Sequence, residues 1–239
     1  MADLLILTPL RSEERILRRF FSGGFSIHSC GLGPHHARER TEKLFDEFRP
    51  DGCVLMGFCA AARSDLSSGE AVLLDQIRCE EIAVEERTED PRPTRNFLKR
   101  SIEELLSEAE RPKEVFPRGA GLTIGRLVAD PEEKYGLGEE YSVDVIDMES
   151  GVVLQIAEKK GIPCVAIRVV LDEAELDLSG FFPLFVRDRE PSARQFSAYL
   201  LRHPRLIVPA FRLLRSYRRA AVGLARAVRM LEEILPSSL

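Results

Sequence analysis

The sequence predicts an α/β fold of three layers, with helices on both faces of a central sheet. Short apolar runs at residues 4–7 and 165–171 are typical of strands that are buried on both faces. Between such runs, apolar residues recur at the spacing of amphipathic helices. Strands and helices that alternate in this way form a sheet between helices, and 239 residues with 44% hydrophobic content can bury one sizeable core.

The amino-terminal end predicts a buried strand over residues 4–7, then a turn and a helix. The helix carries apolar residues at helical spacing, namely Ile16, Leu17 and Phe20. Glu13 lies in its first turn, where the helix dipole favours acidic residues. Spacing alone therefore gives Glu13 a structural role.

The next segments predict further strands. Residues 25–38 indicate a strand, a Gly-x-Gly turn and the start of a helix, and residues 51–77 indicate two strands joined by a turn. Residues 119–137 indicate another strand and a loop. We expect no metal site, because neither cysteine nor carboxylate stands at ligand spacing beside the histidines of this region, which are His28, His35 and His36.

A helix is predicted over residues 150–160, directly after Met148 and Glu149. Two lysines give it a cationic last turn, and Gly161 is a typical C-terminal stop. Pro163 then forbids its continuation.

Asp172 lies at the carboxyl end of the predicted strand over residues 165–171, which only Arg168 interrupts. Ligands bind at this edge of open α/β sheets, so a carboxylate there is a candidate for chemistry. Aspartate is also common as an ordinary turn or cap residue after a strand. From spacing alone, the structural role is favoured over the catalytic one.

Met148-Glu149 before a helix, followed by a buried strand that ends in Asp172, resembles the purine nucleoside phosphorylase and nucleosidase superfamily. The form that it resembles most is the methylthioadenosine/adenosylhomocysteine nucleosidase type. The resemblance implies a three-layer α/β/α sandwich with a mixed central sheet. It also implies that Glu149 grips the ribose hydroxyls and that Met148 packs against the sugar. Asp172 would protonate the departing purine, and Glu13 would orient the attacking water.

The chemistry explains why separate acids are needed. Cleavage of the bond between ribose and base leaves positive charge on the sugar and negative charge on the base, so a proton donor must face the base. Asp172 would need a raised pKa to stay protonated, which burial can provide. Glu149 would act as an ionised acceptor for two hydroxyls.

Residues 51–77 resemble the family's strand, glycine-rich turn and following strand, with Gly57 and Phe58 as substrate contacts. Relatives use a hydroxyl residue and two glycines in this turn to bring backbone amides to phosphate or sugar. Here residues 58–61 are Phe-Cys-Ala-Ala, and Leu55 stands where one branch of phosphorylases has arginine. Both departures favour water over phosphate as acceptor. The acceptor stays open, because phosphate as a co-substrate could still be bound by Arg11, Arg63 or Arg126.

Residues 119–137 resemble the family's fifth strand and the loop that lines the base pocket. By position, Leu127 and Val128 are candidates for contacts with the edge of adenine. Leu171 stands where the family usually has a serine that orients the catalytic aspartate.

The carboxyl-terminal end differs from the rest of the chain in charge. From Arg187 to Arg229 arginines recur and acidic residues are nearly absent. After Pro204, helical spacing separates an apolar face from an arginine face. The apolar residues are Ile207, Phe211, Leu214, Tyr217, Leu224, Val228 and Leu231. The arginines are Arg205, Arg212, Arg215, Arg219, Arg226 and Arg229.

Such a helix can pack on the enzyme's core or on a partner subunit, or it can lie on an anionic membrane surface. Helix statistics favour packing. The tail, which contains LLRHPRLIVPAFRLLRSYRRA, resembles that of the hopanoid-associated phosphorylase branch. This implies that the enzyme releases adenine from adenosylhopane, a nucleoside joined to a polycyclic lipid. We expect a catalytic domain over residues 1–180, with a polar excursion at 79–114, and an Arg-rich helical extension over 181–239.

Composition limits the remaining classes. Five cysteines without paired spacing indicate a reducing compartment. No signal peptide or membrane-spanning run is evident, so we expect a cytoplasmic protein, peripheral at the inner membrane if the tail binds lipid. The net charge of -5 gives no reason to expect nucleic-acid binding. The resemblance implies a homo-oligomer without a cofactor.

Two alternatives stay open. The enzyme could cleave a soluble nucleoside such as methylthioadenosine, adenosylhomocysteine or futalosine. Residues 58–61 and Leu171 could instead mark a nucleoside- or lipid-binding protein that has lost turnover.

Overall fold

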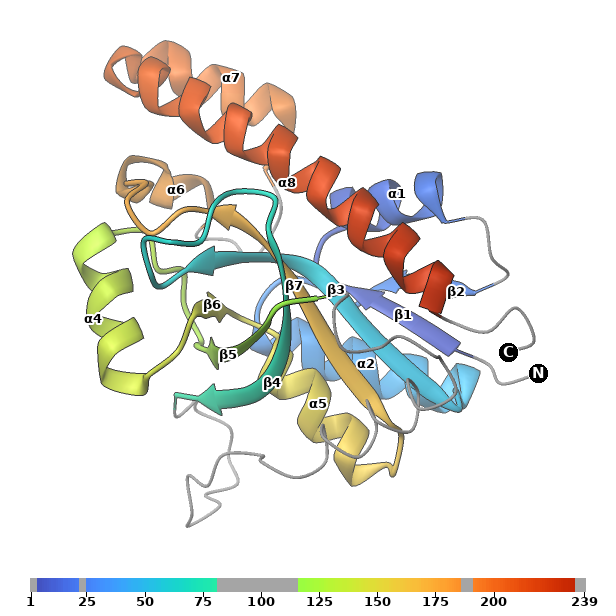
Figure 1. Ribbon diagram of the computed structural model, residues 1–239. Helices are drawn as coiled ribbons and strands as arrows, with labels where there is room; N and C mark the ends of the chain where they lie inside the picture. The colour runs from blue at the N-terminus through green and yellow to red at the C-terminus, as the bar shows by residue number, and fades with distance from the viewer. Residues whose placement is uncertain (1–3, 22–24, 81–115, 186–190, 235–239) are drawn as a thin grey trace.

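The computed structural model describes residues 4–21, 25–80, 116–185 and 191–234, with a seven-stranded sheet between two layers of helices (Figure 1). The strands are β1 Leu4–Thr8, β2 Ser26–Ser29, β3 Gly52–Ala61, β4 Ala71–Cys79, β5 Arg118–Thr123, β6 Val145–Asp147 and β7 Cys164–Asp172. The helices are α1 Arg11–Phe20, α2 Pro34–Phe48, α4 Pro131–Tyr141, α5 Ser150–Lys159, α6 Phe182–Phe185, α7 Ala193–Arg202 and α8 Ile207–Ile234. Short 3-10 helices precede α6 and α8, at Ser179–Phe181 and Pro204–Leu206.

The sheet is mixed, as predicted. Its strand order is β2-β1-β3-β6-β5-β4-β7, and β7 also pairs with β3. The pairs β3–β6 and β4–β7 are antiparallel, and the other pairs are parallel. Because the pairings connect β3, β6, β5, β4 and β7 in a closed circuit, this part of the sheet curls into a small barrel.

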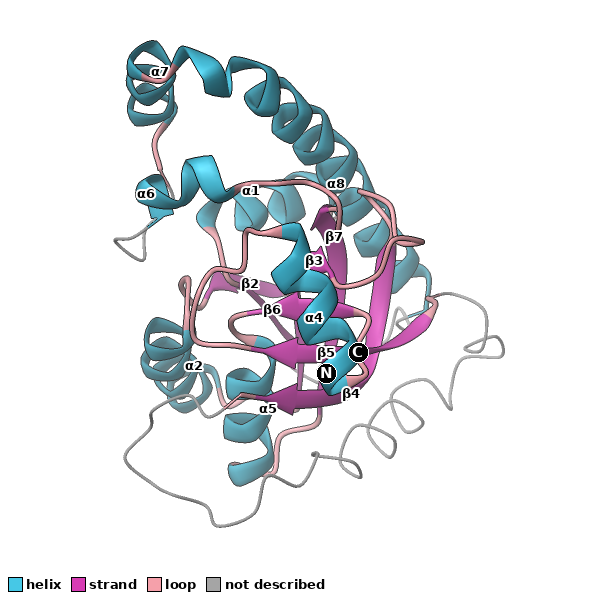
Figure 2. Ribbon diagram, turned by 90° about the vertical axis from the view of Figure 1, so that its left-hand side faces the viewer, coloured by secondary structure: helices cyan, strands magenta, loops and turns pink. Residues whose placement is uncertain are grey.

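Helices cover both faces of the sheet, which confirms the predicted three layers. Helices α1 and α8 contact each other on one side, and α2 and α5 contact each other on the opposite side (Figure 2). Strands between two helical layers must be apolar on both faces. Accordingly, every residue of β1 is buried, and in β7 all residues except Leu171 are buried.

The predicted helix and strand after Glu149 are present almost as expected. Helix α5 ends at Lys159, and β7 extends one residue beyond the apolar run at each end. In the pairing of β3 with β7, Cys59 lies opposite Val170, whereas Ala60 lies opposite Asp172. Leu171 is therefore the extra residue of a β-bulge, a distortion that re-aims neighbouring side chains.

The predicted turn at residues 58–61 is wrong. These four residues belong to β3, and Ala60 and Ala61 pair with β6. The physical reason lies in the residues themselves, because Phe-Cys-Ala-Ala is apolar, lacks glycine and proline, and fits a buried extended strand. The turn begins only after Ala61.

Helix α8 has two unlike halves. Its carboxyl-terminal half packs on α1 and β7, with Leu224, Val228 and Leu231 buried. The backbone there approaches the turn before β4 closely, since a Cβ on Gly223 would lie 2.2 Å from the carbonyl oxygen of Gly69. Its amino-terminal half and α7 extend beyond the sheet (Figure 1), and there Phe211 is 68% exposed.

Other expectations concern the whole chain. Most of the polar excursion at 79–114 lies outside the described residues. All five cysteines are free thiols. Within the described ranges, no helix has both the length and the apolar character needed to cross a bilayer.

Candidate active site

Glu13 connects the first helix with the centre of the sheet. Its Oε2 accepts a hydrogen bond from the Leu10 amide, and its Oε1 accepts one from the Phe58 amide, each at 2.7 Å. The side chain is completely buried. Burial raises the pKa of its carboxyl to about 8, although the two backbone hydrogen bonds oppose this shift. A carboxyl that served only the helix dipole would stay in solvent, so Glu13 does more than favour the helix.

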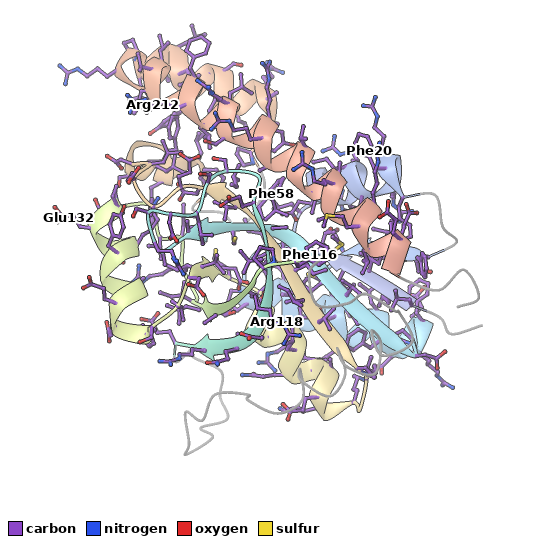
Figure 3. The ribbon with its side chains drawn as sticks, viewed as in Figure 1. Phe20, Phe58, Phe116, Arg118, Glu132 and Arg212 are labelled. Carbon is purple, nitrogen blue, oxygen red and sulfur yellow. The ribbon has the colours of Figure 1, made fainter. Side chains whose placement is uncertain are left out.

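Gly57 makes room for this carboxyl. A Cβ at this position would lie 2.7 Å from Pro9 Cδ, 2.9 Å from Arg168 Nη1 and 3.0 Å from Glu13 Oε1. Only glycine allows the β3 backbone to approach all three groups. Gly57 and Phe58 therefore hold the site through their backbone. The Phe58 side chain lies between the sheet and α8, against the ring of Tyr217 (Figure 3).

Arg168 and Asp147 form the buried polar centre that the sequence did not predict. Arg168 is 0% exposed, and its Nε donates to Asp147 Oδ2 at 2.9 Å and to Ser150 Oγ at 2.8 Å. Asp147 Oδ1 accepts hydrogen bonds from Thr123 Oγ1 and from the amides of Glu149 and Ser150. The available signal was Arg168 itself, since a charge in a strand buried on both faces must have a partner.

Glu149 lies at the start of α5 and faces the same guanidinium. Its Oε1 accepts a hydrogen bond from the Gly33 amide at 2.8 Å, and its Oε2 is 3.5 Å from Arg168 Nη2. Burial raises the pKa of Glu149 to about 7, against the lowering effect of Arg168. Met148 lies beside the same glycine turn, with its Cε 3.7 Å from the position of a Cβ on Gly33.

Asp172 ends β7, four residues after Arg168. It is mostly buried, and its Oδ1 accepts a hydrogen bond from Lys134 Nζ at 2.9 Å. Burial raises the pKa of Asp172 to about 7, and the Lys134 ammonium opposes the rise. The sequence did not predict that Lys134 belongs to the site, because one lysine among the acidic residues of α4 does not indicate a buried side chain.

The structure thus brings Glu13, Gly57, the Phe58 backbone and Glu149 together around Arg168. Asp172 lies at the end of β7, the same strand that carries Arg168. Leu127 is half-buried, and Val128 belongs to a small core cluster with Leu122 and Ile124. Within the described residues, no hydrogen bond or ion pair joins Leu127 or Val128 to these carboxylates, and their contact with a base stays a prediction.

The arginines considered for phosphate are placed elsewhere. Arg63 pairs with Asp65 and Asp144 on the surface, and Arg126 pairs with Glu133. Arg11 is exposed at the start of α1. Around Arg168, by contrast, stand three carboxylates, those of Glu13, Asp147 and Glu149. In the part of the chain that is described, no group of three His, Cys, Asp or Glu side chains could hold a metal ion.

Comparison with known proteins agrees with this arrangement. A sequence model of the phosphorylase superfamily matches residues 9–203. Futalosine hydrolase from Helicobacter pylori superposes with a TM-score of 0.64 at 17% identity, covering 97% of this chain and 98% of that chain.

Two nucleosidase structures are similar in the same way. A putative 5′-methylthioadenosine/S-adenosylhomocysteine nucleosidase from Francisella philomiragia gives a TM-score of 0.68 at 14% identity, covering 99% of this chain and 100% of that chain. A variant of the Helicobacter pylori nucleosidase, solved with 5′-methylthioadenosine in its active site, gives 0.66 at 13% identity and covers 98% of both chains. These identities show a shared fold. Because the family match spans most of the sequence, the chain belongs to the phosphorylase superfamily and is a nucleoside-cleaving enzyme.

Proposed function

We propose that the enzyme hydrolyses the N-glycosidic bond of an adenine nucleoside. The observation that carries this proposal is the pair of buried carboxyl groups on either side of the Arg168 guanidinium, together with Asp172 at the end of the same strand. Glu149 would bind the ribose hydroxyls. Glu13, held by two backbone amides, would orient a water molecule, and Asp172 would face the base.

The reaction balances with these three groups. The bond between the ribose C1′ and the purine nitrogen breaks, and its electron pair leaves with the base. The proton of the Asp172 carboxyl moves to a nitrogen of the purine ring. The water oxygen bonds to C1′, and Glu13 takes the proton that this water loses.

Water suits the charge of the site better than phosphate. Three carboxylates and one guanidinium already give the buried centre an excess of potential negative charge. A phosphate dianion would add to this negative charge, and the Arg168 guanidinium there already faces Asp147 and Glu149, whereas water adds no charge. Incubation with adenine nucleosides in phosphate-free buffer tests the proposal through the release of free adenine. If no adenine nucleoside yields adenine, the proposal is wrong.

The pH dependence follows from Asp172 and Glu149, whose pKa values are about 7, and from Glu13, whose pKa is about 8. Asp172 must be protonated, so its contribution is lost as the pH rises above about 7. Glu149 and Glu13 must be ionised, so their contributions are lost as the pH falls below about 7 and about 8, respectively. We expect a narrow bell-shaped profile of kcat/KM with its maximum near neutral pH. A flat profile over roughly two pH units on either side of the maximum would contradict these assignments.

We further propose that the substrate carries an apolar 5′ substituent, with adenosylhopane as the candidate, and that the enzyme meets it at an anionic membrane surface. Large apolar side chains on α7 and the outer half of α8 are exposed, namely Leu201, Ile207, Val208, Phe211 and Leu214. From residue 191 to residue 231 the sequence contains arginines but no acidic residue. An apolar stripe beside arginines suits lipid headgroups and the acyl chains below them.

Point variants test this proposal better than removal of the helix, because the inner half of α8 covers the core. Val208→Ser/Phe211→Ser is expected to lower binding to anionic vesicles about tenfold, since two apolar side chains are lost from the membrane. Cleavage of a lipid-linked nucleoside in such vesicles should fall in parallel, whereas cleavage of adenosine should not change.

The matched control is Val222→Ser, which removes an apolar side chain of similar exposure, 61%, from the inner half of the same helix. Vesicle sedimentation and adenine release measure the two effects. Equal loss of adenosine and lipid-linked activity in the double variant would contradict a membrane role.

A further inference from the structure

Lys134 is a completely buried lysine that no part of the chemistry described so far requires. It lies in the first turns of α4, after the cap formed by Asp130, whose Oδ1 accepts from the Glu133 amide. Its Nζ donates to three acceptors, which are Asp172 Oδ1 at 2.9 Å, the Glu173 carbonyl at 2.9 Å and the Leu176 carbonyl at 2.7 Å. An ammonium has three hydrogens, so all of its donors are used.

The hydrogen bond from Lys134 holds the Asp172 side chain at one of its two carboxyl oxygens. Lys134 ties α4 to the end of β7 and to the turn that follows it, and it occupies Oδ1 of the carboxyl. The other oxygen, Oδ2, is left to carry the transferable proton. Leu171, the extra residue of the bulge, has no hydroxyl that could orient Asp172. The Lys134 ammonium, which comes from α4, can orient the Asp172 carboxyl instead.

The charged and titratable groups around Asp172 come from three elements. Lys134 contributes from α4, Glu173 and Asp177 follow β7, and Cys59 contributes from β3. Glu173 turns towards Ser68, whose amide and hydroxyl it binds at 3.0 and 2.6 Å, and towards Arg219 at 3.8 Å. Among the described residues, Lys134 is thus the cation that directly contacts Asp172.

We propose that Lys134 is a positioning residue for the reaction, which aims Asp172 at the leaving base and makes its proton easier to transfer. This inference rests on the proposed function, in which Asp172 is the general acid. Burial alone would make Asp172 a weak acid that holds its proton too firmly. A neighbouring ammonium favours the carboxylate that remains after transfer, and so it strengthens the acid.

The test is the pH profile of Lys134→Met, which keeps the length of the side chain and removes its charge. Loss of the ammonium should shift the alkaline limb of kcat/KM upwards by about one pH unit or more, because an opposite charge at this distance changes a carboxyl pKa by that amount. At neutral pH, kcat should fall about tenfold, because the carboxyl becomes a weaker and less well oriented acid. An alkaline limb that stays in place or moves down would overturn the inference.

Two further variants keep the result interpretable. Leu137→Ala removes a buried apolar side chain of α4 without touching Asp172, so it should lower stability and leave the alkaline limb unchanged. Lys134→Gln retains amide donors for the two carbonyls and replaces Lys134→Met if the latter does not fold. If Asp172→Asn is as active as the wild type, the proposed function itself fails. If Asp172→Asn is inactive but neither Lys134 variant shifts the alkaline limb of kcat/KM, the proposed function stands and only the positioning role of Lys134 is wrong.

Discussion

Asp172→Asn is expected to lower kcat for adenine release by about 10²–10⁴-fold, the usual contribution of a general acid. Asparagine has nearly the shape of aspartate, and its oxygen can still accept the hydrogen bond from Lys134. It has no acidic proton to give to the departing base. KM should therefore change little, and the loss should be confined to the chemical step. Steady-state release of adenine at neutral pH measures it.

The control for this variant is Asp177→Asn. Asp177 is an exposed carboxyl five residues further along the chain, where it accepts a hydrogen bond from the Ser179 amide. Because Asp177 is exposed and solvent screens its charge, its replacement should keep kcat within about twofold of the wild type. If Asp172→Asn folds and keeps kcat within about twofold of the wild type, far less than a general acid contributes, Asp172 is only the turn residue that spacing alone favours.

Arg168→Met is expected to cost about 3–5 kcal/mol of folding free energy, because removal of one partner leaves buried charge without compensation. Arg168 lies between Asp147 and Glu149, and none of the three side chains has appreciable contact with solvent. Activity should also fall sharply, since Glu149 would lose the cation that lowers its pKa and would be protonated at neutral pH. Urea unfolding and adenine release measure the two effects.

The double variant Arg168→Met/Asp147→Asn separates charge from packing. Asparagine at position 147 keeps an oxygen for Thr123 and for the two backbone amides, but it removes the uncompensated negative charge. Stability should therefore recover in part, while activity should not. If Arg168→Met alone is as stable as the wild type, the guanidinium is not the electrostatic centre of the site.

Much of the fold could be predicted because local patterns decide it. Strand β7 is an apolar run that ends in a proline-bounded turn on one side and Asp172 on the other, and it is buried as expected. The contact between Glu13 and Phe58 could not be predicted in the same way. The two residues are 45 positions apart, and only the pairing of β1 with β3 brings α1 to this part of the sheet.

One prediction from the sequence is wrong, the turn at residues 58–61, and one buried residue, Lys134, was not identified. The two failures have different physical causes. The turn expected at residues 58–61 came from resemblance to relatives that have glycine there, whereas the local residues favour an extended strand. Lys134 could not be found at all, because α4 has an acidic surface and a weakly amphipathic pattern. Its burial depends on how the turn after β7 folds back over the helix. Arg168, by comparison, stood out as the one charge in a buried strand.

The most direct test of the central claim is to identify what becomes bonded to C1′ when adenine is released. The enzyme is incubated with an adenine nucleoside in ¹⁸O-labelled water, with and without phosphate, and the sugar product is analysed by mass spectrometry. We predict a free sugar that carries the label in both buffers, at equal rates of adenine release. A sugar phosphate, formed only when phosphate is present, would contradict hydrolysis and would make the enzyme a phosphorylase.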